Sequence, residues 1–359
     1  MNLPDHGANP LRLYKELNLE PPVRLLDFSE NVHPFGPPDF IRQQWPALLP
    51  AITRYPDPAA EPFRTAAASF HSVSPDQVAA SNGAAEVFTW LARRYRGKRV
   101  LLAEPAFSEY RKTLEAEGAQ VKTIQLEADD AWALPVNELA PLLADCAAFY
   151  ICNPHNPTGA LIRPEDMKRI AGICRTADCE LVIDEAFMDF AGEAFSFVPQ
   201  LSANPHVTII RSMTKMYALP GLRLGYVLGQ GDVIRELTAG AAHWNVNALA
   251  AAIGAQCFKE SGYRRMIREA AVAERQKMTA FLSGAGCKVT DSAVNFLSFR
   301  LPPSYDPARF LKDMLQRGLI LRHTYSFNGM DGEWFRIGMK SSADMEALRE
   351  AIAGWLRGN

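Results

Sequence analysis

Hydrophobic positions follow two different spacings along the middle of this chain. Residues 84–95 and 108–117 carry apolar side chains at helical spacing, and each stretch is followed by a short strand-like run, at residues 99–103 and 120–125. Further short apolar runs lie at residues 147–152, 180–183 and 206–210. Strands that alternate with helices in this way predict a doubly wound α/β domain built on a mostly parallel sheet.

The pattern changes after residue 247. Residues 248–258 are small and apolar, and residues 263–284 predict one long charged helix. The remaining predicted elements are a strand at 294–299, a helix at 307–317, strands at 319–322 and 333–338, and a final helix at 343–356. We expect a large domain over residues 29–247 and a smaller α+β domain that combines residues 1–28 with residues 248–359.

Three of the predicted strands end in polar residues. The run at 147–152 leads into NPHNPTG at residues 153–159, the next run ends at Asp184, and the third is followed by Lys215. The carboxyl ends of parallel strands lie at one edge of a sheet, where such domains bind their ligands. We therefore expect Asn156, Asp184 and Lys215 to converge although they are far apart in the sequence.

Lys215 stands in the sequence SMTKMYALPGLRLGY at residues 212–226. A lysine amine forms Schiff bases best when it is partly desolvated and held in place. Ser212, Thr214 and Arg223 supply hydroxyls and a guanidinium that suit a phosphate. A Schiff-base lysine beside a phosphate anchor is what pyridoxal phosphate requires. The simpler interpretation, a surface lysine in a polar loop, applies to most single lysines.

Other residues suit the same cofactor, and each also has an ordinary structural interpretation. Asp184 can keep a pyridine nitrogen protonated by charge pairing, or it can cap a helix. Asn156 can donate to a phenolate oxygen, or it can serve as a turn residue before a proline. The backbone N–H groups at Gly83 and Ala84 can bind a phosphate, or they can belong to an Asn-Gly turn. Tyr110 can stack on the ring, or it can pack in the core.

Two arginines, Arg322 and Arg336, lie at or near the ends of short strands of the predicted small domain. Each guanidinium can hold a carboxylate or a phosphate in a fork, so the pair suits a substrate with two anionic groups. Surface ion pairing is the ordinary role of a single arginine.

Composition narrows the class of protein. The formal net charge is −2 with both signs mixed throughout, so we expect no nucleic-acid or anionic-membrane partner. No run of 18 apolar residues and no signal peptide are visible, and the six scattered cysteines favour reduced thiols in a cytoplasmic protein. The seven histidines show no metal-binding spacing, so no metal site is assigned.

Taken together, these motifs resemble those of the class I/II aminotransferases, the fold-type I family of pyridoxal-phosphate enzymes. The resemblance covers essentially the whole chain and depends on NPHNPTG, DEA, SMTK and GLRLG in that order and spacing. It implies that Lys215 carries the cofactor and acts as catalytic base, with Asp184 on the ring nitrogen and Asn156 on the phenolate oxygen. It also implies Gly83, Ala84, Ser212, Thr214 and Arg223 at the phosphate, Tyr110 on the ring face, and a homodimer in which Tyr55 reaches the neighbouring subunit's phosphate.

Within this family the chain is similar to two branches, the histidinol-phosphate aminotransferases and the threonine-phosphate decarboxylases of cobalamin biosynthesis. Three features favour the decarboxylases: Phe187, where the aminotransferases usually have tyrosine, the opening HGAN at residues 6–9, and the segments at residues 27–36 and 244–250. The chain departs from the decarboxylase pattern at Ala8, Glu30 and Lys340, where glycine, alanine and arginine are more usual.

The decarboxylase branch implies a small phosphorylated amino acid, L-threonine O-3-phosphate, as the substrate. On this resemblance Arg336 holds the carboxylate. The other substrate-binding candidates are Arg322, His6, Asn9 and Asn31. Amino transfer is the second hypothesis. A third is a non-catalytic sensor on an aminotransferase-like domain, but the loop at residues 81–83 falls too early for the extra N-terminal domain that such regulators carry.

Phe187 provides a test that needs only the visible absorbance of the cofactor. With no tyrosine hydroxyl at this position, Asn156 is expected to be the main donor to the phenolate oxygen. Phe187→Tyr adds a donor, so the pKa of the linkage between Lys215 and the cofactor should be lower in the variant than in the wild type. Titration of the absorbance of both proteins measures this difference. An equal or lower pKa in the wild type contradicts it.

Overall fold

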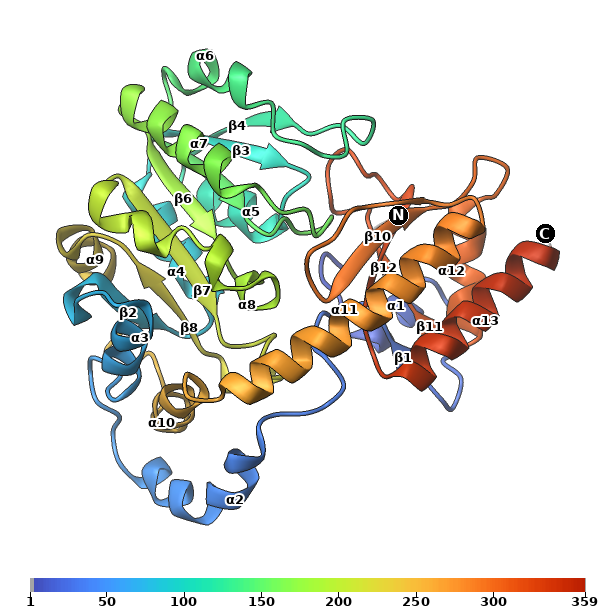
Figure 1. Ribbon diagram of the computed structural model, residues 1–359, viewed down its shortest axis with the longest axis horizontal. Coiled ribbons are helices and arrows are strands. Elements are labelled where there is room, and N and C mark those ends of the chain that lie inside the picture. The colour runs from blue at the N-terminus through green and yellow to red at the C-terminus, as the bar shows by residue number, and fades with distance from the viewer. Residues whose placement is uncertain (1–2, 359) are drawn as a thin grey trace.

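The computed structural model describes residues 3–358 and shows two α/β bodies joined by one long helix (Figure 1). Over these residues, seven strands form the sheet of the larger body in the order β2-β8-β7-β6-β5-β3-β4. Neighbouring strands are parallel except where β8 pairs with β2 and β7, so the expected mostly parallel sheet is confirmed. The strands are β2 (Val78–Ser81), β3 (Arg99–Glu104), β4 (Gln120–Gln125), β5 (Ala148–Cys152), β6 (Glu180–Asp184), β7 (Val207–Ser212) and β8 (Gly225–Leu228).

Both faces of this sheet are buried, which is why its central strands are apolar at nearly every position. In β6, Leu181 and Ile183 pack into the core on one face, whereas Val182 packs into the core on the other. Helices α3 (Phe63–His71), α7 (Pro164–Thr176) and α10 (Ala248–Cys257) supply the first core. Helices α4 (Ala84–Arg94), α5 (Ser108–Ala116) and α9 (Gly231–Thr238) supply the second. The short helices α6 (Leu139–Leu143) and α8 (Met188–Ala191) complete this body.

The smaller body has its own core and includes the N-terminal segment. In the described chain its antiparallel sheet has the order β12-β13-β10-β9, and β1 pairs in parallel with β11. The Tyr14 hydroxyl donates to the Leu315 carbonyl at 2.6 Å and ties the N-terminal helix to this core. The elements are α1 (Pro10–Glu16), β1 (Leu26–Asp27), β9 (Lys288–Val289), β10 (Phe296–Arg300), α12 (Pro307–Gln316), β11 (Leu319–Ile320), β12 (Arg322–His323), β13 (Trp334–Gly338) and α13 (Ser342–Gly358).

The long helix α11 (Ser261–Gly284) belongs to both bodies (Figure 1). Ile267 packs in the core of the larger body, and Met278 packs in that of the smaller one. The structure therefore differs from the expected boundary at residue 248, because α10 packs on the larger body. Gly254 allows this approach, since a Cβ there would collide with Phe63.

One further helix, α2 (Asp39–Leu48), lies at the edge of the larger body, at the bottom of Figure 1. Trp45 on this helix, together with Leu49 and Ile52 just after it, is largely exposed. None of the helices within residues 3–358 is long and apolar enough to cross a membrane.

Candidate active site

A cavity of about 370 Å³ lies at the carboxyl ends of β5, β6 and β7 and is lined by residues of both bodies. Asn156, Asp184 and Lys215 all line it, so the three strand ends bring together side chains that are distant in the sequence. Arg322 and Arg336 line the same cavity from the smaller body. A cavity of this size with a few convergent polar groups is typical of a small-molecule site.

Asp184 ends β6, is buried and lines the cavity. Its Oδ1 accepts the backbone N–H of Ala186 at 2.9 Å, and its Oδ2 accepts the hydroxyl of Tyr110. Burial raises the pKa of the Asp184 carboxyl, while the two donors and the nearby Lys215 oppose this effect.

Lys215 follows β7 in a loop, with its Nζ 5.7 Å from the centre of the Phe187 ring. Burial lowers the pKa of its ammonium. Asp184 opposes this effect, whereas Arg223 and Arg336 add to it. A lowered pKa increases the fraction of neutral amine at neutral pH, which is the nucleophilic form.

Another part of the cavity lining suits an anion. Gly83, with a φ of +74°, is the N-cap of α4. Ala84 and Ala85, in the first turn of this helix, line the cavity, and the N–H groups of a first helical turn are free to bind an anion. Arg223 lies so close to Gly83 that a Cβ at that position would collide with its guanidinium. Ser212 and Thr214 also line the cavity.

These groups fit pyridoxal phosphate. One cavity brings together a buried carboxylate, a phosphate cradle with a guanidinium and helix N–H groups, and an amine of lowered pKa. Asn156 suits the phenolate oxygen, because its Oδ1 accepts from Arg336 at 2.5 Å and its amide N–H₂ is left to donate.

Arg322 and Arg336 are both buried, and their recorded partners in the described chain are not carboxylates. Arg322 donates to the carbonyls of His323 and Asp5 and to the hydroxyl of Ser326. Burial lowers its pKa to about 10. Arg336 donates to Asn156 and, at 3.0 Å, to the Ser29 carbonyl.

Arg336 is the less satisfied of the two arginines. Its Nε is buried and has no hydrogen-bond partner among the described residues. Burial, together with the charge of Arg322, lowers its pKa to about 9. Neither guanidinium forms a direct ion pair within residues 3–358, although the Asp5 carboxylate acts on Arg322 from a greater distance. Two buried guanidiniums with mainly neutral partners suit anionic groups of a ligand.

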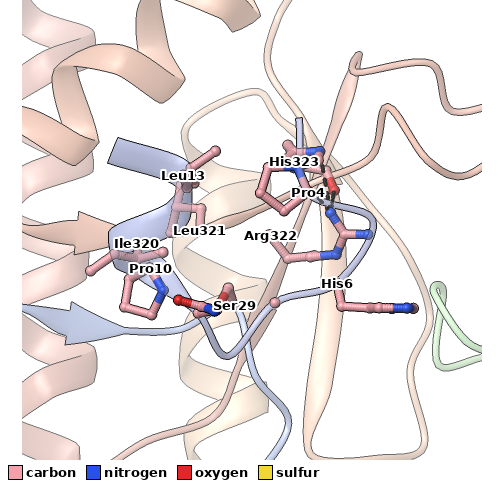
Figure 2. Close-up of a pocket in the computed structure, with 11 residues that line it drawn as sticks. Pro4, His6, Pro10, Leu13, Ser29, Ile320, Leu321, Arg322 and His323 are labelled. Carbon is pink, nitrogen blue, oxygen red and sulfur yellow. Dashed lines mark hydrogen bonds between the residues drawn. The ribbon is translucent and has the colours of Figure 1, made fainter. Parts of the chain in front are cut away.

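The N-terminal segment lies beside Arg322, where Pro4 and His6 help to line a small hollow (Figure 2), and residues 5–8 also line the cavity. His6 lines the cavity, and its Nε2 lies 3.0 Å from Glu109 Oε1 on α5. Asn9 is exposed and lines a small adjoining hollow instead of the cavity. Ala8 has a φ of +66°, a left-handed conformation that explains why glycine suits this position better.

Three other candidates have informative surroundings. Asn31 lines the cavity, and its buried Oδ1 has no partner within residues 3–358. Tyr55 is 81% exposed and packs its ring against Trp244 at 4.6 Å, away from the cavity of its own chain. Phe187 lines the cavity and leaves no hydroxyl near Lys215.

Tyr110 is the candidate whose position differs most from expectation. Tyr110 is buried and is not part of the cavity lining. Phe107, the N-cap residue of the same helix α5, lines the cavity instead. The sequence did contain a signal for Phe107, because it follows the carboxyl end of β3 more closely than Tyr110 does.

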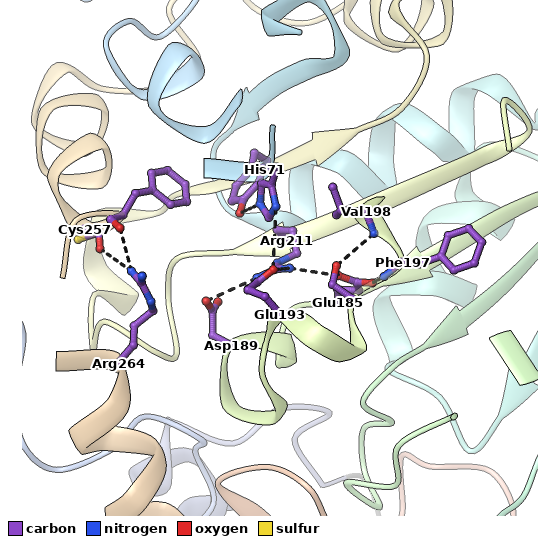
Figure 3. Close-up of polar contacts among 12 residues, drawn as sticks. His71, Glu185, Asp189, Glu193, Phe197, Val198, Arg211, Cys257 and Arg264 are labelled. Carbon is purple, nitrogen blue, oxygen red and sulfur yellow. Dashed lines mark hydrogen bonds and ion pairs between the residues drawn. The ribbon is translucent and has the colours of Figure 1, made fainter. Parts of the chain in front are cut away.

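A buried ion cluster lies behind the same strand ends (Figure 3). Arg211, next to Ser212, forms ion pairs with Glu185, Asp189 and Glu193 at 3.1, 3.5 and 2.5 Å. Glu185 directly follows Asp184, so its pair with Arg211 links the ends of β6 and β7. Burial raises the pKa of Glu185 to about 7.

Two of the departures from the decarboxylase pattern contact each other. Lys340 Nζ lies 3.4 Å from Glu30 Oε1 and donates to the Val32 carbonyl at 2.8 Å. Glu30 lines the cavity, so the pair holds the segment that also carries Asn31. The two substitutions are therefore complementary in charge.

Comparison with known proteins shows the family of this chain and its cofactor. The model of the aminotransferase class I and II family matches residues 23–353, and the chain belongs to this family. It is therefore a pyridoxal-phosphate-dependent enzyme. No group of three or more His, Cys, Asp or Glu side chains in the described part of the chain could hold a metal ion.

Individual relatives include both branches. The threonine-phosphate decarboxylase of Salmonella typhimurium is 30% identical over 358 residues, which cover 98% of this chain and 97% of that protein. A histidinol-phosphate aminotransferase of Thiobacillus denitrificans is also 30% identical, over 92% of this chain and 91% of its own. The solved structure of L-threonine-O-3-phosphate decarboxylase from Porphyromonas gingivalis superposes with a TM-score of 0.80 at 25% identity, covering 92% of this chain and 99% of that one.

The Glu30–Lys340 pair predicts a measurable coupling. Glu30→Ala and Lys340→Met should each destabilise the protein, and the double variant should be less destabilised than the sum of the two by up to about 1 kcal/mol, because the pair is partly buried. Denaturant unfolding of the four proteins measures the coupling. Strict additivity would mean that the two side chains do not act as a pair.

Proposed function

We propose that this enzyme decarboxylates L-threonine O-3-phosphate to (R)-1-aminopropan-2-yl phosphate, the precursor of a cobalamin side chain. The observation that carries the proposal is the pair of buried arginines Arg322 and Arg336, neither of which bonds directly to a carboxylate of residues 3–358. A substrate with a carboxylate and a phosphate on one short skeleton supplies one anion to each guanidinium.

In this proposal the arginines bind the substrate, and Lys215 transfers the proton. Arg336 holds the substrate carboxylate, and Arg322 holds the phosphate together with His6 and Asn31, whereas Asn9 lines only the adjoining hollow. Pyridoxal phosphate, when bound, takes up the electron pair that remains on Cα after a bond to that atom breaks. In decarboxylation the bond from Cα to the carboxylate carbon breaks, carbon dioxide leaves, and the Lys215 ammonium gives a proton to Cα.

Other side chains in the cavity hold the cofactor. Asp184 pairs with the protonated ring nitrogen, and Asn156 donates to the phenolate oxygen. Gly83, Ala84, Ser212, Thr214 and Arg223 hold the phosphate. Because Arg336 donates to Asn156, the side chain that orients the substrate is connected directly to one that orients the cofactor.

Amino transfer from histidinol phosphate is the alternative. A histidinol-phosphate aminotransferase is as similar to this chain as a threonine-phosphate decarboxylase is, at 30% identity in each case. In that reaction Lys215 removes the Cα proton instead of supplying one. The amino acceptor of that reaction, 2-oxoglutarate, also offers carboxylates to Arg336, so the arginine pair does not separate the two reactions. We favour decarboxylation because Phe187 stands where that branch usually has tyrosine and because residues 6–9 read HGAN.

We also propose that the enzyme is a cytoplasmic homodimer. Tyr55 and Trp244 form an exposed aromatic pair, and Trp45, Leu49 and Ile52 expose further apolar surface on and after α2. A second copy of the chain would cover this surface and bring Tyr55 to the partner's phosphate site. The six cysteines are buried and unpaired, which suits a reducing compartment.

The substrate assay separates the two reactions. The holoenzyme should release carbon dioxide from L-threonine O-3-phosphate in the absence of any keto acid acceptor. A parallel incubation with histidinol phosphate and 2-oxoglutarate should yield no glutamate. Glutamate from the second mixture, without carbon dioxide from the first, would establish the aminotransferase instead.

Substitution of Arg322 tests how the phosphate is bound. Arg322→Gln should lower kcat/KM for threonine phosphate by about a hundredfold, because it removes charge-assisted hydrogen bonds to a dianion. Turnover of unphosphorylated threonine, which lacks that anion, should change little in the same variant and serves as the control. Equal losses with both substrates would place Arg322 outside the phosphate site.

A further inference from the structure

Tyr110 lies behind the cavity and contacts the carboxylate that faces it. Its side chain is 2% exposed and is absent from the cavity lining. Its hydroxyl donates to Asp184 Oδ2, and the thiol of Cys152, which pairs with Asp184 across the sheet, lies in hydrogen-bonding contact with the same hydroxyl. The residue is thus bonded to the functional group of the site without entering the cavity.

The ring of Tyr110 is fixed by aromatic neighbours on several sides. Phe88 lies 4.8 Å from it, Phe107 5.7 Å and Tyr150 6.0 Å between ring centres, all in edge-to-face arrangements. This packing fixes the direction in which the hydroxyl points. It also leaves no face of the ring free to stack on a molecule in the cavity, whereas Phe107 lines the cavity itself.

Asp184 depends on its donors because it is buried. A carboxylate removed from water tends to take up a proton, and burial is the largest influence on the pKa of Asp184. The Tyr110 hydroxyl and the Ala186 N–H each satisfy one carboxylate oxygen and favour the charged form. A carboxylate has about four lone-pair sites, so acceptor capacity remains for a ligand N–H.

We propose that Tyr110 is a positioning residue whose hydroxyl orients Asp184 and keeps it charged toward the cofactor's ring nitrogen, and that Phe107 supplies the aromatic wall of the cavity in its place. The role is the same whether the enzyme decarboxylates or transfers an amino group. It requires only that Asp184 holds the ring nitrogen.

Tyr150 provides a matched control. It is a buried tyrosine on β5 whose ring lies in the same aromatic cluster, and its hydroxyl has no hydrogen-bond partner within residues 3–358. Tyr150→Phe therefore removes one buried hydroxyl from this cluster without removing a donor from Asp184. Both variants keep their aromatic rings, so only the hydroxyls differ.

The first experiment compares the two variants without relying on turnover. Apoenzyme is titrated with pyridoxal phosphate while tryptophan fluorescence is followed, and thermal unfolding of each apoenzyme verifies the fold. Tyr110→Phe should bind the cofactor about tenfold more weakly than wild type, the loss typical of one hydrogen bond to a charged group. Tyr150→Phe should bind within about twofold of wild type. Equal affinity for the two variants would overturn the proposal.

A double-mutant cycle shows whether the hydroxyl acts through the carboxylate. Asp184→Asn should weaken cofactor binding on its own, and Tyr110→Phe added to it should weaken binding by less than about twofold more. A full tenfold further loss in the Asp184→Asn protein would show that Tyr110 acts elsewhere. Cofactor affinity unchanged by Asp184→Asn alone would instead refute the role of Asp184, on which the proposal depends.

Discussion

The burial of charged groups at one edge of the larger sheet is the constraint on which the site depends. Asp184, Arg322 and Arg336 are removed from water, and the Lys215 ammonium is held with them in one cavity. Burial of a charged group without partners costs free energy, and hydrogen bonds from the surrounding chain offset part of this cost. Asp184 receives two donors, whereas the arginines receive only neutral acceptors. Among the side chains that line the cavity, Lys215, Arg223, Arg322 and Arg336 outnumber the carboxylates of Asp5, Glu30 and Asp184, and an anionic cofactor and substrate supply further negative charge.

Hydrogen bonds and ion pairs connect the side chains assigned to the cofactor with those assigned to the substrate. Arg336 bonds to Asn156 on the larger body and to the Ser29 carbonyl on the segment that leaves the N-terminal region. The Glu30–Lys340 pair holds the same segment from the other side. Behind the strands, Glu185 and Arg211 link the ends that carry Asp184 and Ser212. The positions of the groups that touch ligands are thus set by contacts made outside the cavity.

Much of the fold follows from local pattern. Buried parallel strands are continuous apolar runs, so β5 and β6 were predicted to within a residue. The edge strand β4 and the helices α4, α5 and α12 were predicted equally closely. The strands β2 and β8 were missed. Each is four residues long. The sequence of β2, VAAS, holds a single β-branched residue, and β8 follows a loop instead of an α-helix and runs antiparallel to its neighbours. The domain boundary was displaced because an apolar helix such as α10 does not show in its sequence which core it joins.

The sequence by itself determined the chemistry of the site. Lys215, Asp184, Asn156 and Arg223 stand in motifs whose order and spacing define the family, and parallel strand order requires the first three to meet. Only the tertiary structure decided which aromatic side chain faces the cavity. Tyr110 and Phe107 are three residues apart at the start of one helix, and both are apolar enough for either role. Their directions depend on packing against Phe88 and Tyr150 and on the bond to Asp184, and these partners come from other segments of the chain.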